Sequence, residues 1–97
     1  MHVRFSNRAE ADLKEIKEYL EPRSPQGLDR VMAAIFTTSG QLESFPFLGR
    51  PGRVPDTFEI TVPRTPFFLV YAMDQDEAYY IDILRVMHTS RSYPIET

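Results

Sequence analysis

The sequence contains no cysteine, no long apolar run and no surplus of positive charge. Without cysteine among its 97 residues, neither a disulfide nor a thiolate zinc site can hold the fold, and a reducing compartment is permitted. The stretch MHVRFSNRAEADL is too polar for a signal peptide, and no window approaches the ~20 apolar residues of a membrane span. We therefore expect a soluble, cytoplasmic protein with no membrane partner.

The charge balance argues against a protein that holds nucleic acid mainly by neutralising phosphates. Eleven lysines and arginines stand against fourteen aspartates and glutamates, for a net charge of -3. Two histidines without cysteine, and no HExxH spacing, lead us to expect no metal site and no cofactor. Every lysine or arginine after Arg30 is an arginine, the side chain suited to bidentate contacts with anions.

The first half of the chain has a helical pattern. With 42% hydrophobic residues, the chain can bury one core, so residues 1–97 should form a single domain. A short strand over residues 2–5 should lead into a helix capped by Asn7, with Glu10 three residues on. A second helix should begin with Ser24 as its cap and Pro25 at its first position, and run as far as Pro46. So short a connection predicts an antiparallel helical hairpin.

The second half of the chain has a strand pattern. Residues 45–56, rich in proline and glycine, should be a connecting loop. Residues 57–62 alternate, with Glu59 on the polar side, and two further strands should follow over FFLVYAM and AYYIDILRVM. The predicted class is α+β in the order β-α-α-β-β-β. The last three strands should form an antiparallel meander, and the helical hairpin should pack on one face of this small, mainly antiparallel sheet.

The last predicted strand ends in a polar cluster, ILRVMHTSRSYP. His88 could act as acid or base in metal-independent RNA cleavage, with Glu59 on a neighbouring strand as a second such group. Arg85 and Arg91 could stabilise a phosphate, and Tyr93 could stack on a base or donate a proton. The other interpretation is structural: His88 ends an apolar row as a packing residue, and Arg85 pairs with Glu59 or with a helix carboxylate.

Other candidate residues suit contact with a macromolecular partner. Arg50 and Arg53 lie in the glycine- and proline-rich loop, where binding residues are disproportionately found. Arg64 lies in the PRTP turn, followed by Phe67 and Phe68, which could be core or partner-facing apolar surface. For Arg91, contact with a partner and simple exposure to solvent are equally compatible with the sequence.

Four stretches in this order resemble the RelE/ParE family of type II toxin–antitoxin toxins. They are AEADLKEIKEYLEPRSP, LESFPFLGRPGRVPDT, VPRTPFFLVYAM and ILRVMHTSRSYP, and together they cover most of the chain. The resemblance implies a small toxin that arrests growth until a cognate antitoxin neutralises it. The assemblies to be expected are a homodimer or a heterotetramer of toxin and antitoxin. It also implies that the partner-facing residues contact the target or the antitoxin: Arg50, Arg53, Arg64, Phe67, Phe68 and Arg91.

The family contains two kinds of toxin. RelE-like members cleave mRNA on the ribosome, and ParE-like members inhibit DNA gyrase. RNA-cleaving members are strongly basic and usually carry an arginine just before the Leu-Val-Tyr stretch, whereas this chain is acidic and has Phe68 there. We therefore expect a ParE-like toxin that binds gyrase. The alternatives are a ribosome-dependent mRNA endonuclease, with His88, Arg91, Tyr93 and Arg85 as its catalytic set, and an inactive relative.

Overall fold

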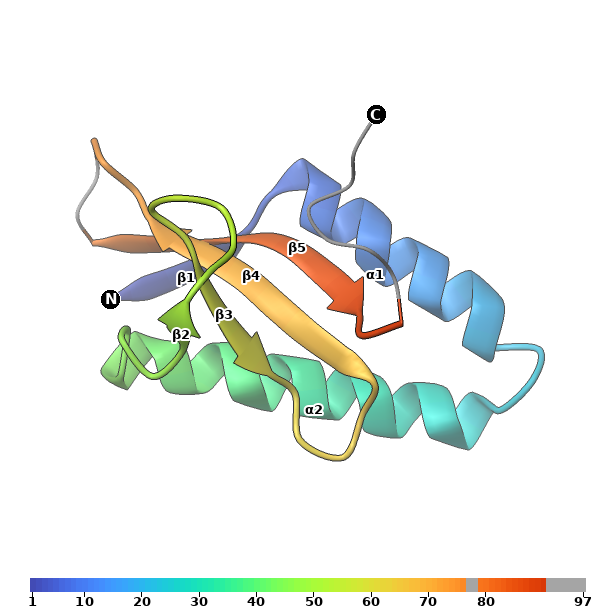
Figure 1. Cartoon of the computed structure of the whole chain (residues 1–97). Helices are drawn as coiled ribbons and strands as arrows, with labels where there is room; N and C mark the ends of the chain where they lie inside the picture. Colours follow the sequence, from blue (N-terminus) through green and yellow to red (C-terminus); the bar gives the residue numbers. More distant parts are fainter. Residues whose placement is uncertain (77–78, 91–97) are drawn as a thin grey trace.

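The protein is a two-helix, one-sheet structure, seen in a computed structural model that describes residues 1–76 and 79–90 (Figure 1). The elements follow in the order β1 (His2–Phe5), α1 (Asn7–Leu20), α2 (Pro25–Ser44), β2 (Arg50–Pro51), β3 (Phe58–Thr61), β4 (Phe67–Met73) and β5 (Tyr80–His88). The predicted α+β class and the order of the predicted elements are confirmed. The predicted connecting loop was wrong at Arg50–Pro51, which forms a short edge strand.

The strands form one mixed sheet in the order β1-β5-β4-β3-β2. β3, β4 and β5 make the predicted antiparallel meander, whereas β1 joins β5 in parallel, with His2 opposite Tyr80 and Phe5 opposite Ile83. The first strand of the chain therefore completes the sheet beside the last one. This pairing places the start of α1 alongside β5.

The core lies between the sheet and the helices, which form the predicted hairpin on one face of the sheet (Figure 1). Ile35 and Leu42 of α2 are fully buried against Leu69 and Ile83 of the central strands. Burying apolar side chains of this size is the main source of stability in a domain without disulfides. The rest of the fully or almost fully buried apolar cluster comprises Ala9, Ile16, Leu28, Val62, Tyr71, Ile81 and Val86.

Serine side chains cap both helices. α1 begins at Asn7, and its cap is Ser6, whose Oγ accepts a hydrogen bond from Ala9 N at 3.0 Å, so the predicted Asn7 cap was wrong by one residue. Ser24 caps α2 through Gly27 N at 3.0 Å, and Pro25 occupies the first turn as predicted. Each cap satisfies one of the amide donors that a helix start leaves unpaired.

A β-bulge in β5 changes which face the end of this strand presents. Val70 lies opposite Arg85, but Tyr71 lies opposite Ile83, so Leu84 is the extra residue. A one-residue insertion moves every following side chain to the other face. Regular alternation would place Ile83 with Arg85 on one face and Val86 with His88 on the other, whereas the bulge puts His88 on the helix-covered face with Ile83.

Candidate functional site

His88 is a packing residue at the end of β5. Its ring meets Phe67 edge to face, with centroids 5.3 Å apart. Its Nδ1 accepts a hydrogen bond from Ser90 N at 3.0 Å and lies 2.6 Å from Ser90 Oγ. Because Nδ1 acts as an acceptor, the proton of the neutral ring is on Nε2. These contacts match the structural interpretation of this histidine.

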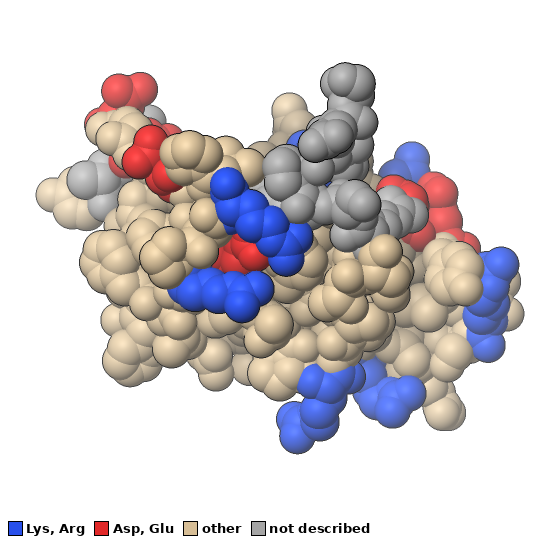
Figure 2. All heavy atoms as spheres, in the orientation of Figure 1, with Lys and Arg blue, Asp and Glu red and all other residues tan. Residues whose placement is uncertain are grey.

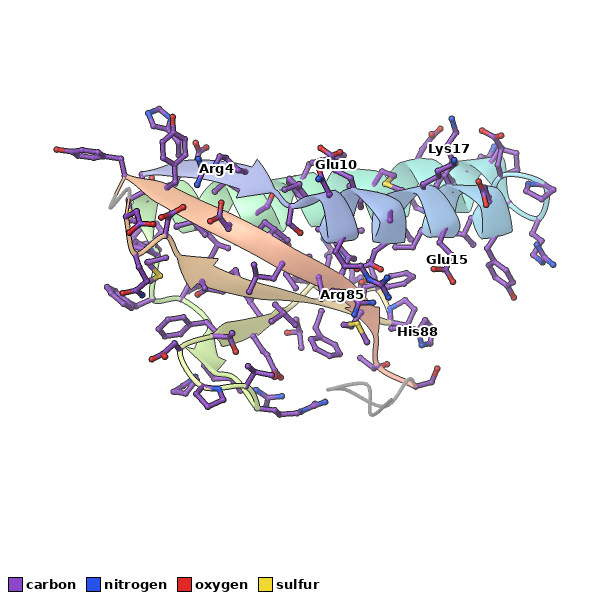
Figure 3. The ribbon with its side chains drawn as sticks, turned by 90° about the horizontal axis from the view of Figure 1, so that it is seen from above. Arg4, Glu10, Glu15, Lys17, Arg85 and His88 are labelled. Atoms are coloured by element: carbon purple, nitrogen blue, oxygen red, sulfur yellow. The ribbon has the colours of Figure 1, made fainter. Side chains whose placement is uncertain are left out.

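Arg85 pairs with a carboxylate of α1, which was one of the two partners expected from the sequence, the other being Glu59. Its Nε and Nη2 donate to Asp12 of α1 at 2.8 and 3.1 Å. Asp12 also accepts a hydrogen bond from Val86 N at 2.9 Å. This buried carboxylate therefore pairs a backbone donor of β5 beyond the point where the pairing with β1 ends. Figure 3 shows Arg85 and His88 near the same end of β5, beside α1.

A half-open cavity of about 440 Å³ lies between α1 and the ends of β4 and β5. Its wall is mainly apolar, and His88 and Arg85 contribute to its polar rim. Asp12 neutralises the guanidinium there, so the described lining residues supply no concentrated positive field for a phosphate. Its other lining residues include Ile16, Leu20, Val31, Phe67 and Val86.

A second polar cluster occupies the opposite face of the sheet. Glu59 lies across from Val70, which precedes the bulge, and its side chain is only 2% exposed. Its Oε2 accepts a hydrogen bond from Arg53 N at 2.9 Å, and its Oε1 lies 3.7 Å from both Arg50 Nη2 and Arg53 Nε. Glu59 lies on the face away from the helices, as the alternation predicts, but it is buried because the segment that carries Arg50 and Arg53 folds over it. Strand periodicity alone could not have identified Asp12 as the partner of Arg85, or Arg50 and Arg53 as the partners of Glu59.

The loop carrying these arginines is held by Tyr71. The buried hydroxyl donates to Pro46 O and accepts from Gly49 N, both at 2.9 Å. Burial raises the pKa of Tyr71, and the hydrogen bond from Gly49 only partly offsets that rise. A Cβ on Gly49 would lie 2.8 Å from Glu59 O and from Tyr71 Oη, so only glycine fits between the loop and the sheet.

The remaining candidates are scattered. Arg64 is exposed in the β3–β4 turn, and Phe67 faces the cavity. Phe68 lies on the opposite face, 5% exposed, with the Arg53 guanidinium 5.4 Å above its ring. Arg91 and Tyr93 lie outside the described residues.

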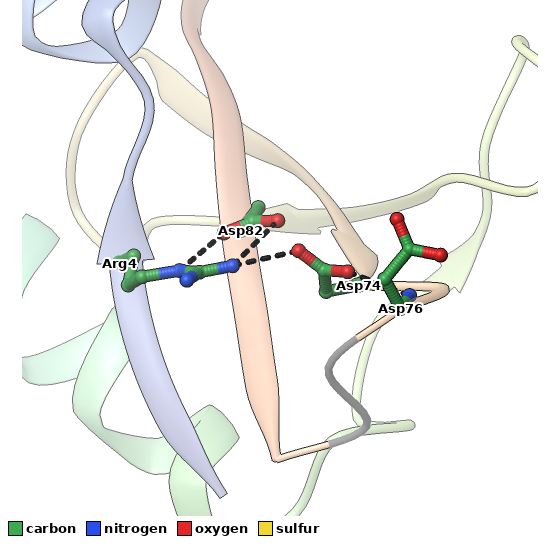
Figure 4. A network of polar contacts seen from close by, with 4 residues as sticks. All are labelled: Arg4, Asp74, Asp76 and Asp82. Carbon is green, nitrogen blue, oxygen red and sulfur yellow. Dashed lines mark hydrogen bonds and ion pairs between the residues drawn. The ribbon is translucent and has the colours of Figure 1, made fainter.

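Sequence reasoning missed one further network, at the far end of the sheet. Arg4 donates to Asp82 at 2.9 Å and to Asp74 at 2.7 Å (Figure 4). Its guanidinium also lies 3.8 Å from the centre of the Tyr80 ring. Arg4 and Asp82 are direct neighbours in the parallel pairing, so the network depends on a register that the sequence does not display. The network joins β1 to the β4–β5 hairpin and is structural.

The placement of the charged side chains bears on two alternatives, a metal site and a nucleic-acid groove. Residues 1–76 and 79–90 contain no group of three or more metal-ligating side chains. On the face drawn in Figure 2 the cationic side chains are scattered and form no continuous stripe. No described helix is long and apolar enough to cross a bilayer.

Known proteins share this sequence pattern and this fold. Y4kP of Sinorhizobium fredii, named as a candidate toxin, is 35% identical over 92 residues, which cover 95% of this chain and 92% of that protein. A structure titled as the chromosomal ParDE system of P. aeruginosa has the same fold, with a TM-score of 0.66, 24% identity and coverage of 91% of this chain and 95% of that one. The RelBE2 toxin–antitoxin complex of Mycobacterium tuberculosis matches with a TM-score of 0.62, 30% identity and coverage of 90% and 95%.

The family comparison agrees with these likenesses. The model described as the ParE toxin of the type II toxin–antitoxin system parDE matches residues 3–93. The resemblance inferred from the four sequence stretches is thereby confirmed, and this chain belongs to the ParE toxin family of type II toxin–antitoxin systems.

Proposed function

We propose that this toxin arrests growth by binding DNA gyrase, with residues 1–97 acting as one domain. The observation that carries the proposal is the separation of the acid and base candidates. His88 lies on the helix-covered face of the sheet, packed on Phe67, whereas Glu59 lies on the opposite face beneath Arg50 and Arg53. Cleavage at one phosphate needs both groups within hydrogen-bond reach of the same substrate.

The arginines support the same proposal. Arg85 is engaged by Asp12, while Arg50 is 70% exposed on the short edge strand β2, in a segment that Tyr71 and Glu59 hold in place. A held loop presenting arginines and apolar side chains is typical of protein-binding surfaces, in which arginine and aromatic residues carry much of the binding energy. We assign target contact to Arg50 and Arg53.

The partner that silences the toxin is proposed to be a cognate antitoxin. A related protein of Mycobacterium tuberculosis was crystallised as a toxin–antitoxin complex. The described surface leaves large apolar side chains in water, and such patches mark interaction sites. An antitoxin segment that orders as it binds would cover them, at the cost of its own conformational entropy.

A supercoiling assay tests the gyrase proposal. The full-length chain is added to purified gyrase, relaxed plasmid and ATP, and the loss of supercoiled product is measured. We expect inhibition that the antitoxin reverses, together with filamentation and DNA-damage signalling when the toxin is induced in cells. Undiminished supercoiling, combined with rapid loss of translation and cut mRNA in the induced cells, would favour the ribosome-dependent endonuclease instead.

A further inference from the structure

The cluster formed by Glu59, Arg50 and Arg53 combines a buried anion with exposed cations. The Glu59 side chain is 2% exposed, whereas those of Arg50 and Arg53 are 70% and 47% exposed. A carboxylate this deep normally needs cationic partners and hydrogen bonds to remain ionised. Here the backbone N–H of Arg53 supplies the hydrogen bond, at 2.9 Å.

The two guanidinium groups are held close to Glu59 without making short hydrogen bonds to it. The distances from Oε1 to Arg50 Nη2 and Arg53 Nε are both 3.7 Å, beyond the 2.7–3.2 Å range of N–H···O bonds. Each guanidinium carries five donors in a planar fork that fits a carboxylate or phosphate. Within this group of three residues, two positive charges stand against one negative charge.

The cluster surrounds a small hollow. Its volume is about 80 Å³, and Thr61, Phe68 and Thr89 complete its walls around the three charged residues. A space of this size admits a single anionic group rather than a base or a sugar. The Phe68 ring lies under the Arg53 guanidinium, at 5.4 Å, and limits where that group can move.

We propose that Arg50 and Arg53 bind one aspartate or glutamate side chain of a protein partner, and that Glu59 is the internal counter-ion that positions both arginines and competes with the incoming carboxylate. This inference rests on the proposed function, since it names the chemistry by which the toxin's target-binding loop recognises a partner. Glu59 is a positioning residue that does not itself touch the partner.

The observations favour an acidic protein segment over RNA. Holding RNA requires several phosphate contacts along a basic track, and this chain is acidic overall, with a charge of -3. The hollow offers one anion position, and exposed apolar side chains precede it in the chain, with Leu48 52% and Phe47 72% exposed. Arginines beside exposed apolar residues are characteristic of protein interfaces.

Fluorescence anisotropy on the full-length chain tests the proposal. The probe is a short fluorescein-labelled peptide in which glutamates alternate with leucines and serines. Comparison probes are the same peptide with glutamine in place of glutamate, and a short single-stranded RNA. We expect the chain to bind the glutamate peptide at least tenfold more tightly than either, because charge-assisted hydrogen bonds are the strong ones.

Three variants separate the roles of the residues. Arg50→Gln should weaken binding of the glutamate peptide roughly tenfold, the loss expected for one charge-assisted hydrogen bond. Glu59→Gln should tighten it roughly threefold at low salt, because the competing charge is gone while the amide oxygen can still accept from Arg53 N. The control is Arg30→Gln, which removes an equally positive but remote and exposed arginine and should leave binding unchanged.

The opposite results would overturn the proposal. Equal binding of the glutamine peptide, tighter binding of the RNA, or unchanged affinity in folded Glu59→Gln would each contradict it. If Glu59→Gln does not fold, Arg50→Gln still decides, because an arginine so exposed is not required by the core. The supercoiling assay is independent of the peptide: inhibition without peptide binding refutes this site alone, and peptide binding without inhibition refutes gyrase alone.

Discussion

The surroundings of His88 predict a mild effect of its removal. Replacing His88 with alanine deletes an edge-to-face contact with Phe67 and the acceptor for Ser90, so we expect a loss of about 1–2 kcal/mol in stability. Growth arrest by the folded variant should be nearly unchanged, since no proton transfer depends on the ring. The measurements are growth after induction and the free energy of unfolding.

A nuclease would respond differently to the same change. Loss of a general acid or base costs ~100-fold to 10,000-fold in rate without a matching loss of stability. Abolished growth arrest in a His88→Ala protein that unfolds near the wild-type temperature would therefore restore the endonuclease alternative. Arg50→Ala combined with Arg53→Ala is the comparison, and it should reduce growth arrest more than His88→Ala does.

The raised pKa of Tyr71 predicts that the free energy of unfolding decreases at alkaline pH. Because burial raises its pKa, the folded state keeps the phenol proton at a pH where the unfolded chain has released it. The contribution of Tyr71 to stability is therefore constant below pH ~10, and it falls as pH rises from there through the folded-state pKa, by at most about 1.4 kcal/mol per pH unit. Unfolding by denaturant at a series of alkaline pH values measures this slope.

Tyr71→Phe should remove that slope and lower stability at neutral pH. Gly49 N and Pro46 O each lose a partner, which costs about 1–2 kcal/mol. The difference between wild type and variant should then shrink above pH ~10. Tyr79→Phe is the control, because Tyr79 is 76% exposed and its replacement should leave the alkaline slope intact. Equal slopes in wild type and Tyr71→Phe would contradict this account.

At the scale of the helices, the two serine caps should differ in their contribution. Ser6 Oγ accepts from Ala9 N and also donates to Leu84 O at 3.1 Å, which joins the start of α1 to the bulge in β5. Within residues 1–76 and 79–90, the Ser24 side chain makes one hydrogen bond, its cap bond from Gly27 N. We expect Ser6→Ala to cost about 2 kcal/mol and Ser24→Ala about 1 kcal/mol. Thermal or denaturant unfolding of both variants gives the comparison, and a larger loss in Ser24→Ala would contradict it.

The β3–β4 turn holds an arginine where glycine fits better. Thr65 N donates to Val62 O at 3.2 Å, with Pro63 and Arg64 between them, and Arg64 has φ 61°. A proline followed by a residue of positive φ describes a type II turn, whose third position favours glycine. Arg64→Gly should therefore raise the free energy of unfolding by about 0.5–1 kcal/mol.

Arg64→Ala is the matched control for this turn, because it removes the same side chain and keeps the positive φ. It should not stabilise the protein. If Arg64 contacts the target or the antitoxin, as the family resemblance implies, both variants should bind that partner more weakly. Stabilisation by alanine would show that the side chain, and not the backbone, is strained.

The sequence predicted the positions of the helices and strands better than the face of the sheet on which each side chain lies. Helical spacing, the Ser24-Pro25 start of α2 and the apolar runs of β4 and β5 have local signals, and those predictions are confirmed. The bulge at Leu84 has none, since a bulge depends on how two strands align, and it places His88 on the same helix-covered face as Ile83. The burial of Glu59 likewise results from a loop fold that alternation cannot reveal.

The whole molecule leaves much apolar surface in water. Among the described residues, Phe45, Phe47 and Leu48 follow one another closely and are 63%, 72% and 52% exposed. We predict that the chain self-associates when isolated and becomes well behaved in complex with its antitoxin. Size-exclusion chromatography with light scattering, with and without the antitoxin, measures this.

A double variant isolates the cause of that self-association. Phe45→Ser with Leu48→Ser removes two exposed apolar side chains that the core does not need, so it should shift the isolated chain toward the monomer. A wild-type chain that remains monomeric at high concentration, without its antitoxin, would contradict the prediction.

The parallel pairing of β1 with β5 affects the order in which the newly made toxin can mature. β1 and α1 leave the ribosome first, but β1 pairs with Tyr80–Ile83, and Asp12 of α1 binds Arg85 and Val86. Contacts so distant along the chain close late in folding. A product of premature termination before β5 lacks the strand that lies between β1 and β4, so it cannot form the sheet, and we expect it to be harmless to the cell.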